Sequence, residues 1–119
     1  DTARALLDGT ASIGAPPNDE GPINNGTNTT LVVVATNARL NKVSAKKLAQ
    51  LAQIGMARTI RPVHTMSDGD VVIALSLGTQ QADVNTLGVA AADAVQEAIL
   101  RGVRLARSAG GLPGLGGDG

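Results

Sequence analysis

The sequence predicts a layered α/β fold. Two short runs, residues 29–36 and 70–77, are apolar or β-branched almost throughout, which is typical of strands that are buried on both faces of a sheet. Each run is followed by a longer stretch with apolar residues at helical spacing, residues 42–58 and 84–106. Because two doubly buried strands cannot form a stable sheet alone, we expect other chain segments to complete it.

The first 28 residues contain no clear strand or long helix. Residues 1–8 predict a short helical or turn segment, and residues 9–28 predict a loop because they are rich in Gly, Pro and Asn. A loop of this length inside a compact domain is expected to be functional or disordered. The chain starts without Met and shows no signal peptide, so we expect a piece of a larger, cytoplasmic protein.

The first strand is expected to end in a turn over residues 37–41, after which a helix begins with Asn41 or Ser44 as its cap. The apolar residues of this helix recur on one side: Ala45, Leu48, Ala49, Ala52 and Met56. Residues 59–69 form a connection that contains Pro62 and ends in the turn Ser67-Asp68-Gly69, directly before the second strand.

The second helix is the longest element, and Asp83 or Asn85 is its expected cap. Small side chains dominate its apolar stripe, which should let it lie close to a sheet or another helix: Leu87, Ala90, Ala91, Ala94, Ala98 and Gly102. The glycine-rich residues 110–119 are expected to form a flexible tail.

Composition excludes several classes of protein and site. Ten basic and ten acidic residues cancel, which argues against a nucleic-acid binder. The chain has no Cys and no aromatic Phe, Tyr or Trp, which excludes thiolate metal sites and base-stacking platforms. With a single His, we expect no metal site and no cofactor. No run approaches the ~18 apolar residues of a membrane span, so we expect no membrane partner.

The junction between the loop and the first strand is the first candidate site. Thr29 stands at the head of a buried strand, a position that can present a nucleophile. A Thr hydroxyl is a weak nucleophile and needs a neighbouring base. If the peptide bond before Thr29 is cut, its own α-amine, with a pKa of about 7.7–8.0, can serve as that base. The alternative is that Thr29 and Thr30 are ordinary strand-start residues.

The run NTTLVVVATNA at residues 28–38 resembles the start of the β-subunit in the L-aminopeptidase/D-amidase/D-esterase family, also called the DmpA or β-aminopeptidase family. The stretch LAQLAQIGMARTIRPVHTMSDGDVVIALSLG at residues 48–78 resembles a later part of the same subunit. Together the resemblance covers about residues 28–106, which is most of the chain.

The resemblance implies a precursor that cuts itself into an α and a β piece, with the new N-terminal Ser or Thr of β as the nucleophile. Thr29 matches that nucleophile, and Asn28-Thr29 matches the autocleavage bond. The implied fold is a four-layer αββα sandwich of the DmpA and ornithine acetyltransferase type, of which this chain supplies the C-terminal part. Residues 1–28 would end the α segment and form the processing loop, 29–109 would be the β part, and 110–119 the tail.

The turn into the second strand is the second candidate site. By the resemblance, Asp70 matches the acidic member of a triplet that supports the nucleophile, and Asp68 falls where some relatives carry Ser. We therefore expect Thr29, Asp70 and Asp68 to be catalytic, while the alternative is a solvated Asp-Gly turn. A Ser–His–Asp triad of Ser67, His64 and Asp70 is not expected, because residues three apart in one connection rarely converge.

The function implied is a self-processing aminopeptidase or amidase that hydrolyses amide or ester bonds of substrates with a free amino terminus, through an acyl-enzyme. The expected partners are the α segment of the same precursor, a small peptide or amide substrate and further αβ units in a homo-oligomer. The oxyanion donors for substrate are expected outside this chain. Two alternatives stay open: an acyltransferase of the ornithine acetyltransferase type, and a non-catalytic subunit of a larger assembly.

Overall fold

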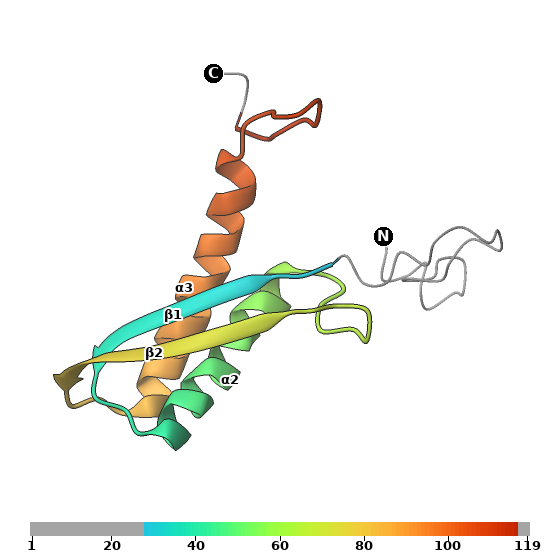
Figure 1. Cartoon of the computed structure of the whole chain (residues 1–119). Coiled ribbons are helices and arrows are strands. Elements are labelled where there is room, and N and C mark those ends of the chain that lie inside the picture. Colours follow the sequence, from blue (N-terminus) through green and yellow to red (C-terminus); the bar gives the residue numbers. More distant parts are fainter. Residues whose placement is uncertain (1–27, 117–119) are drawn as a thin grey trace.

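The computed structural model describes residues 28–116, which form two strands and two long helices (Figure 1). In chain order these are β1 (Leu31–Ala38), α2 (Lys42–Thr59), β2 (Val71–Gln80) and α3 (Val84–Leu105). The predicted order of strand, helix, strand and helix is therefore confirmed. The predicted segment at residues 1–8 and the loop up to residue 27 lie outside the described residues.

β1 and β2 pair in parallel, with Leu31 opposite Val71 and Thr36 opposite Ser76. A parallel pair needs a crossover between its strands, and α2 supplies it. Both strands extend further at their carboxyl ends than predicted, because Ala38 still pairs with Gln80 after an irregularity in the register. Both also begin later than predicted, so residues 29, 30 and 70 precede the regular pairing.

Both helices cover the same face of the sheet, as Figure 1 shows. Alternate strand residues point toward them, and Val32, Val34 and Val72 pack against a cluster of buried side chains from α2 and α3. That cluster consists of Leu48, Ala52, Met56, Ala91 and Val95. The apolar stripe predicted for α2 is confirmed at Leu48, Ala52 and Met56.

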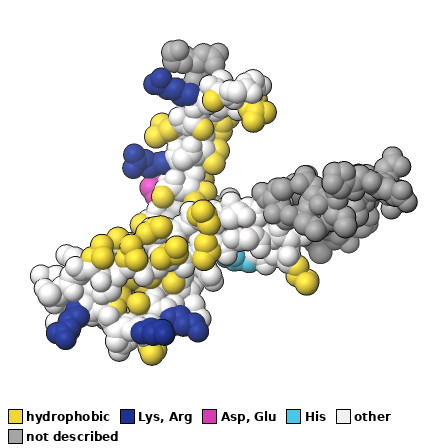
Figure 2. Space-filling model, in the orientation of Figure 1, with side chains coloured by type: hydrophobic (Ala, Val, Ile, Leu, Met, Phe, Trp, Pro, Cys, Tyr) yellow, Lys and Arg dark blue, Asp and Glu magenta, His cyan; other side chains and the backbone are white. Residues whose placement is uncertain are grey.

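The opposite face of the sheet is uncovered among the described residues. Its side chains are large and apolar, and Leu31 and Leu77 are each 72% exposed. Figure 2 shows hydrophobic side chains over the strands on this face. We call this surface the outer sheet face: Leu31, Val33, Val71, Ile73, Leu75 and Leu77. Within residues 28–116 the strands are thus packed on one face only, whereas their sequence pattern predicts burial on both.

Each helix begins at a cap that the sequence predicts. The Asn41 side chain accepts a hydrogen bond from the Ser44 N–H at 2.8 Å, and Asp83 accepts one from the Thr86 N–H at 2.8 Å. Such caps satisfy backbone donors that have no partner inside the helix. The hydrogen bonds from Thr86 hold the pKa of Asp83 below its usual value.

The buried face of α3 differs from the predicted stripe. The buried residues are Gly88, Ala91, Ala92 and Val95, so only Ala91 is shared with the prediction. The reason is that α3 packs closely against α2: a side chain at Gly55 would meet Ala92 and Val95, and one at Gly88 would meet Leu51.

Two small residues of the predicted α3 stripe, Ala94 and Ala98, face a groove beside β1. Val95, Ile99 and residues 30–35 complete its lining, and its volume is about 470 Å³. Beyond α3, Ala109 and Leu112 close a short turn through two backbone hydrogen bonds of 3.0 and 3.1 Å. Within residues 28–116, no helix combines the length and the hydrophobicity that crossing a membrane requires.

Candidate active site

The segments that enter the two strands lie side by side. Asn28 and Asp68 form a parallel bridge, and the Gly69 N–H donates a hydrogen bond of 2.9 Å to the Asn28 carbonyl oxygen. Two residues further along, the Val71 N–H donates to the Thr30 carbonyl at 3.0 Å. The parallel register therefore brings the first candidate site, around Thr29, against the second, at residues 68–70.

Thr29 is held on both sides by the segment that leads into β2. The carbonyl before it is bound by the Gly69 N–H, and the N–H after it, from Thr30, donates to Asp70 Oδ1 at 2.8 Å. The Thr29 side chain lies over Gly69, where an added Cβ would come within 2.7 Å of Thr29 Oγ1. Thr29 is itself exposed. Its backbone is therefore held in place while its side chain is open to solvent.

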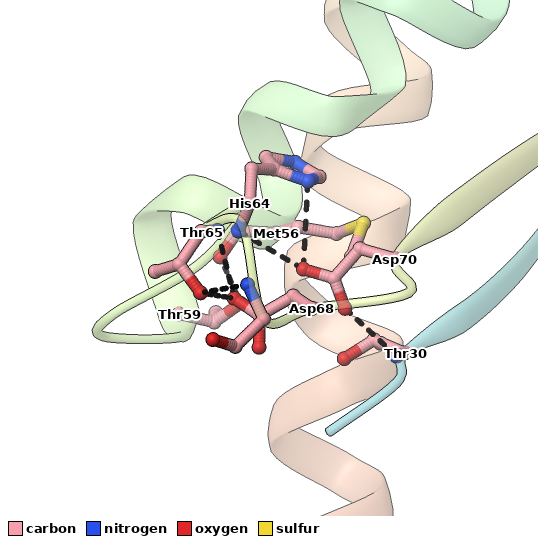
Figure 3. Close-up of polar contacts among 8 residues, drawn as sticks. Thr30, Met56, Thr59, His64, Thr65, Asp68 and Asp70 are labelled. Carbon is pink, nitrogen blue, oxygen red and sulfur yellow. Dashed lines mark hydrogen bonds and ion pairs between the residues drawn. The ribbon is translucent and has the colours of Figure 1, made fainter. Parts of the chain in front are cut away.

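Asp70 is a half-buried anion of the site, and its side chain is only 5% exposed. Besides the Thr30 N–H, its carboxylate accepts the His64 N–H at 3.0 Å, and it lies 3.4 Å from His64 Nδ1 (Figure 3). Burial raises the pKa of Asp70, but hydrogen bonds from the His64 and Thr30 backbones outweigh it and hold that pKa below its usual value. Asp70 is therefore a carboxylate at neutral pH.

Asp68 has a different set of contacts. Its Oδ2 accepts hydrogen bonds from both the N–H and the hydroxyl of Thr65, each at 2.8 Å, and the Asp68 N–H returns a bond to the Thr65 carbonyl at 3.1 Å (Figure 3). Within residues 28–116 its carboxylate makes no hydrogen bond to Thr29. These contacts shape the turn that places Gly69. Asp68 therefore acts on Thr29 indirectly, through the position of the Gly69 backbone.

His64 reaches Asp70 because the connecting loop turns back on itself. Its backbone φ of 55° lies in the left-handed region, which residues other than Gly seldom adopt. In the described part of the chain the Ser67 hydroxyl makes no hydrogen bond to His64 or Asp70. The contact of His64 with Asp70 and the position of Gly69 beside Asn28 and Thr29 are not predictable from the sequence, since each depends on the fold of the loop.

The residues that the structure describes contain no group of three or more His, Cys, Asp or Glu side chains that could hold a metal ion. At the strand heads the described residues bring together the Thr29 hydroxyl, backbone N–H groups and the carboxylates of Asp68 and Asp70.

Comparison with known proteins identifies the family of the chain. It is 43% identical to an uncharacterized aminopeptidase of Mycobacterium leprae, over 72% of this chain and 28% of that protein. It is 37% identical to an uncharacterized aminopeptidase of Mycobacterium bovis, over 78% of this chain and 31% of that protein. A 6-aminohexanoate-oligomer endohydrolase of a Kocuria species is 27% identical, over 70% of this chain and 27% of that protein.

The chain thus spans less than a third of the length of these relatives. Residues 3–115 match the sequence profile of peptidase family S58, which accounts for nearly the whole chain. The parallel strands, their adjacent heads and the two covering helices belong to a part of that family's domain. On the extent of this match, the chain belongs to peptidase family S58.

Proposed function

We propose that this chain is the C-terminal part of a hydrolase that cuts its own Asn28-Thr29 bond and then uses Thr29 as an N-terminal nucleophile. The observation that carries the proposal is the clamp around Thr29, in which the carbonyl before it and the N–H after it are both held by residues 69 and 70. Family membership and the names of the relatives, which describe an aminopeptidase and an oligomer endohydrolase, support hydrolysis as the reaction.

Self-processing would begin with attack of Thr29 Oγ1 on the Asn28 carbonyl carbon. A C–O bond forms, the C–N bond to Thr29 breaks, and the hydroxyl proton passes to the departing nitrogen. The result is an ester between Asn28 and the Thr29 side chain, together with a free α-amine. Water then hydrolyses the ester, which leaves a carboxylate on Asn28 and a free hydroxyl on Thr29.

Turnover would reuse the same hydroxyl. The neutral α-amine of Thr29 takes the hydroxyl proton as Oγ1 attacks the carbonyl of the substrate, and the proton then passes to the leaving amine or alcohol. Water hydrolyses the acyl-enzyme. The negative charge of Asp70 favours protonation of this amine, and its hydrogen bond to the Thr30 N–H fixes the direction of the strand start. Asp68 contributes by shaping the turn at Gly69.

The rest of the proposed enzyme would cover the outer sheet face. Six large apolar side chains on this face favour a second sheet as their neighbour, which would produce the αββα sandwich. The α segment of the same precursor would supply that sheet and the substrate pocket. Peptides or amides with a free amino terminus are the proposed substrates, and αβ units the building blocks of a homo-oligomer.

Intact-mass analysis of the full-length precursor tests the proposal. Thr29→Ala should leave the chain uncut and inactive, because no hydroxyl remains at the bond. Thr29→Ser should be cut, because it loses only a methyl group. Thr30→Ala is the matched control one residue away, and it should be cut because its backbone N–H still binds Asp70. Normal cleavage of Thr29→Ala, or loss of cleavage in Thr30→Ala alone, would contradict the assignment of Thr29.

A further inference from the structure

We infer that Gly69 is a catalytic residue of the self-processing step: its backbone N–H stabilises the oxyanion that forms on the Asn28 carbonyl when Thr29 attacks. The inference rests on the proposed cleavage at Asn28-Thr29 and deepens it. It assigns a donor for the processing reaction within this chain, whereas the donors for substrate are expected outside it.

The position of Gly69 carries the inference, because its N–H binds one reacting group and the space of its missing side chain faces the other. Its N–H lies 2.9 Å from the Asn28 carbonyl oxygen, which is the atom that gains negative charge in the tetrahedral intermediate. An oxyanion donor must lie about 2.7–3.1 Å from the position that this oxygen takes in the intermediate, and the Gly69 N–H already binds the same oxygen in the resting chain. A Cβ attached to the same residue would point at Thr29 Oγ1.

The missing side chain matters as much as the N–H. A Cβ on residue 69 would lie 2.7 Å from Thr29 Oγ1, which is closer than carbon and oxygen atoms approach without a covalent bond between them. Any other residue would therefore displace the hydroxyl that must reach the Asn28 carbonyl carbon. Gly69 is the residue that allows the hydroxyl and the donor to meet at one carbonyl.

The hydrogen bond would strengthen as the reaction proceeds. In the resting chain it joins two neutral groups, and in the intermediate it joins an N–H to an anion, which makes a hydrogen bond about twice as strong. Only an interaction that gains strength in the transition state accelerates a reaction. Removal of one such donor from an acyl-transfer enzyme slows the reaction by about 10²–10³-fold.

The alternative is that this bond is merely one rung of the parallel ladder. The chain provides a matched control, because the Val71 N–H donates to the Thr30 carbonyl at 3.0 Å in the same pattern. That rung connects the same two segments but does not touch the carbonyl to be cleaved. If both hydrogen bonds only hold the strands together, removing either one should change the cleavage rate equally. If the Gly69 N–H binds the oxyanion, only its removal should slow cleavage.

Replacing single amides by esters in the full-length precursor separates the two roles. Glycolic acid in place of Gly69 removes its N–H and adds no side chain, and α-hydroxyisovaleric acid in place of Val71 removes the control N–H. We expect the Gly69 ester to slow the appearance of the fragment that begins at Thr29 by about 10²–10³-fold. The Val71 ester should process within a few-fold of the unmodified rate. The two esters should lower the temperature of thermal unfolding by similar amounts.

Equal processing rates in the two esters would overturn the inference. Gly69→Ala provides a second route if an ester fails to fold: it should block processing, while Gly102→Ala, where nothing lies within 4 Å of the added Cβ, should not. Cleavage of folded Gly69→Ala at the normal rate would contradict the steric part. Thr29→Ala is run beside them, since its cleavage would refute the proposed nucleophile itself rather than the role of Gly69.

Discussion

At the scale of single residues, the site depends on two adjacent residues that hold Thr29 through different groups. Gly69 and Asp70 follow each other in the chain and hold the two sides of Thr29, one through a backbone N–H and the other through a carboxylate. His64 in turn holds the carboxylate, through its backbone and its ring. The backbone that carries the exposed Thr29 hydroxyl is thus held by groups that are themselves held, as a reactive group requires.

Asp70→Asn should preserve the fold but slow both processing and turnover. The amide oxygen can still accept the Thr30 N–H, but the NH₂ group cannot accept the His64 N–H, and the negative charge beside Thr29 is lost. We expect a loss of about 1–3 kcal/mol in the free energy of unfolding. Cleavage rate and urea denaturation measure the two effects. Full activity in Asp70→Asn together with none in Asp68→Asn would show that the two carboxylates have been assigned in the wrong order.

The stability of the protein should depend on the protonation of Asp70. Its pKa is lower in the folded protein than its ordinary value, so the unfolded chain binds the proton more readily. The stabilisation is present above the unfolded pKa of about 3.9 and is lost as the pH falls through the folded value. Urea denaturation between pH 6 and pH 2 should therefore show a smaller drop in stability for Asp70→Asn than for the unmodified protein. Equal drops would contradict this prediction.

At the scale of elements, the contact between α2 and α3 determines how the helices cover the sheet. The two helices approach through Gly55, which lies against the Ala92 backbone and the Val95 side chain, and through Gly88, which lies against the Leu51 side chain. The ion pair between Arg58 and Asp93, at 2.7 Å, also joins them, but both side chains are about half exposed or more. Such a surface pair contributes at most about 1 kcal/mol, so packing dominates this interface.

Gly88→Ala should destabilise the protein, because its new Cβ would meet the Leu51 side chain. Overpacking of this kind costs about 1–3 kcal/mol. Gly102→Ala on the same helix is the matched control, and it should be neutral or stabilising by up to about 1 kcal/mol, since Ala favours a helix and its Cβ meets nothing. Urea denaturation of the assembled protein compares the two, and an equal effect would contradict the packing argument.

At the scale of the whole molecule, the outer sheet face is the dominant feature. Leu31, Val33 and Leu77 are each more than half exposed, and they belong to one continuous apolar sheet surface. Soluble proteins seldom leave apolar patches of this kind in water. β1 has a partner strand on one side only within residues 28–116, and the apolar groove beside it continues the same surface toward α3.

Residues 1–119 expressed alone should therefore bind a hydrophobic dye and unfold without a sharp transition. Co-expression with the remainder of the precursor should abolish dye binding and restore a cooperative transition, because the outer sheet face is then covered. Dye fluorescence and differential scanning calorimetry measure both. A cooperative unfolding transition of the isolated chain as a monomer at low concentration would contradict the need for a covering segment.

The sequence by itself determined the parts that depend on neighbours along the chain. Apolar β-branched runs and helical spacing predict all four elements in the right order, with bounds that differ from the structure by up to three residues. Local capping chemistry predicts two alternative N-terminal caps for each helix, and the caps in the structure, Asn41 and Asp83, are among them. The position of Thr29 at the head of the first predicted strand makes it a candidate, and the family resemblance adds Asp70.

Only the tertiary structure decided which faces are buried and which candidates meet. Hydrophobicity predicts a different stripe on α3, but Gly88 and Ala92 are buried because close contact with α2 favours the smallest residues. The contacts of Gly69 and His64 depend on strand register and on a left-handed turn. Such contacts join residues far apart in the sequence, so periodicity, which reports only local geometry, carries no information about them.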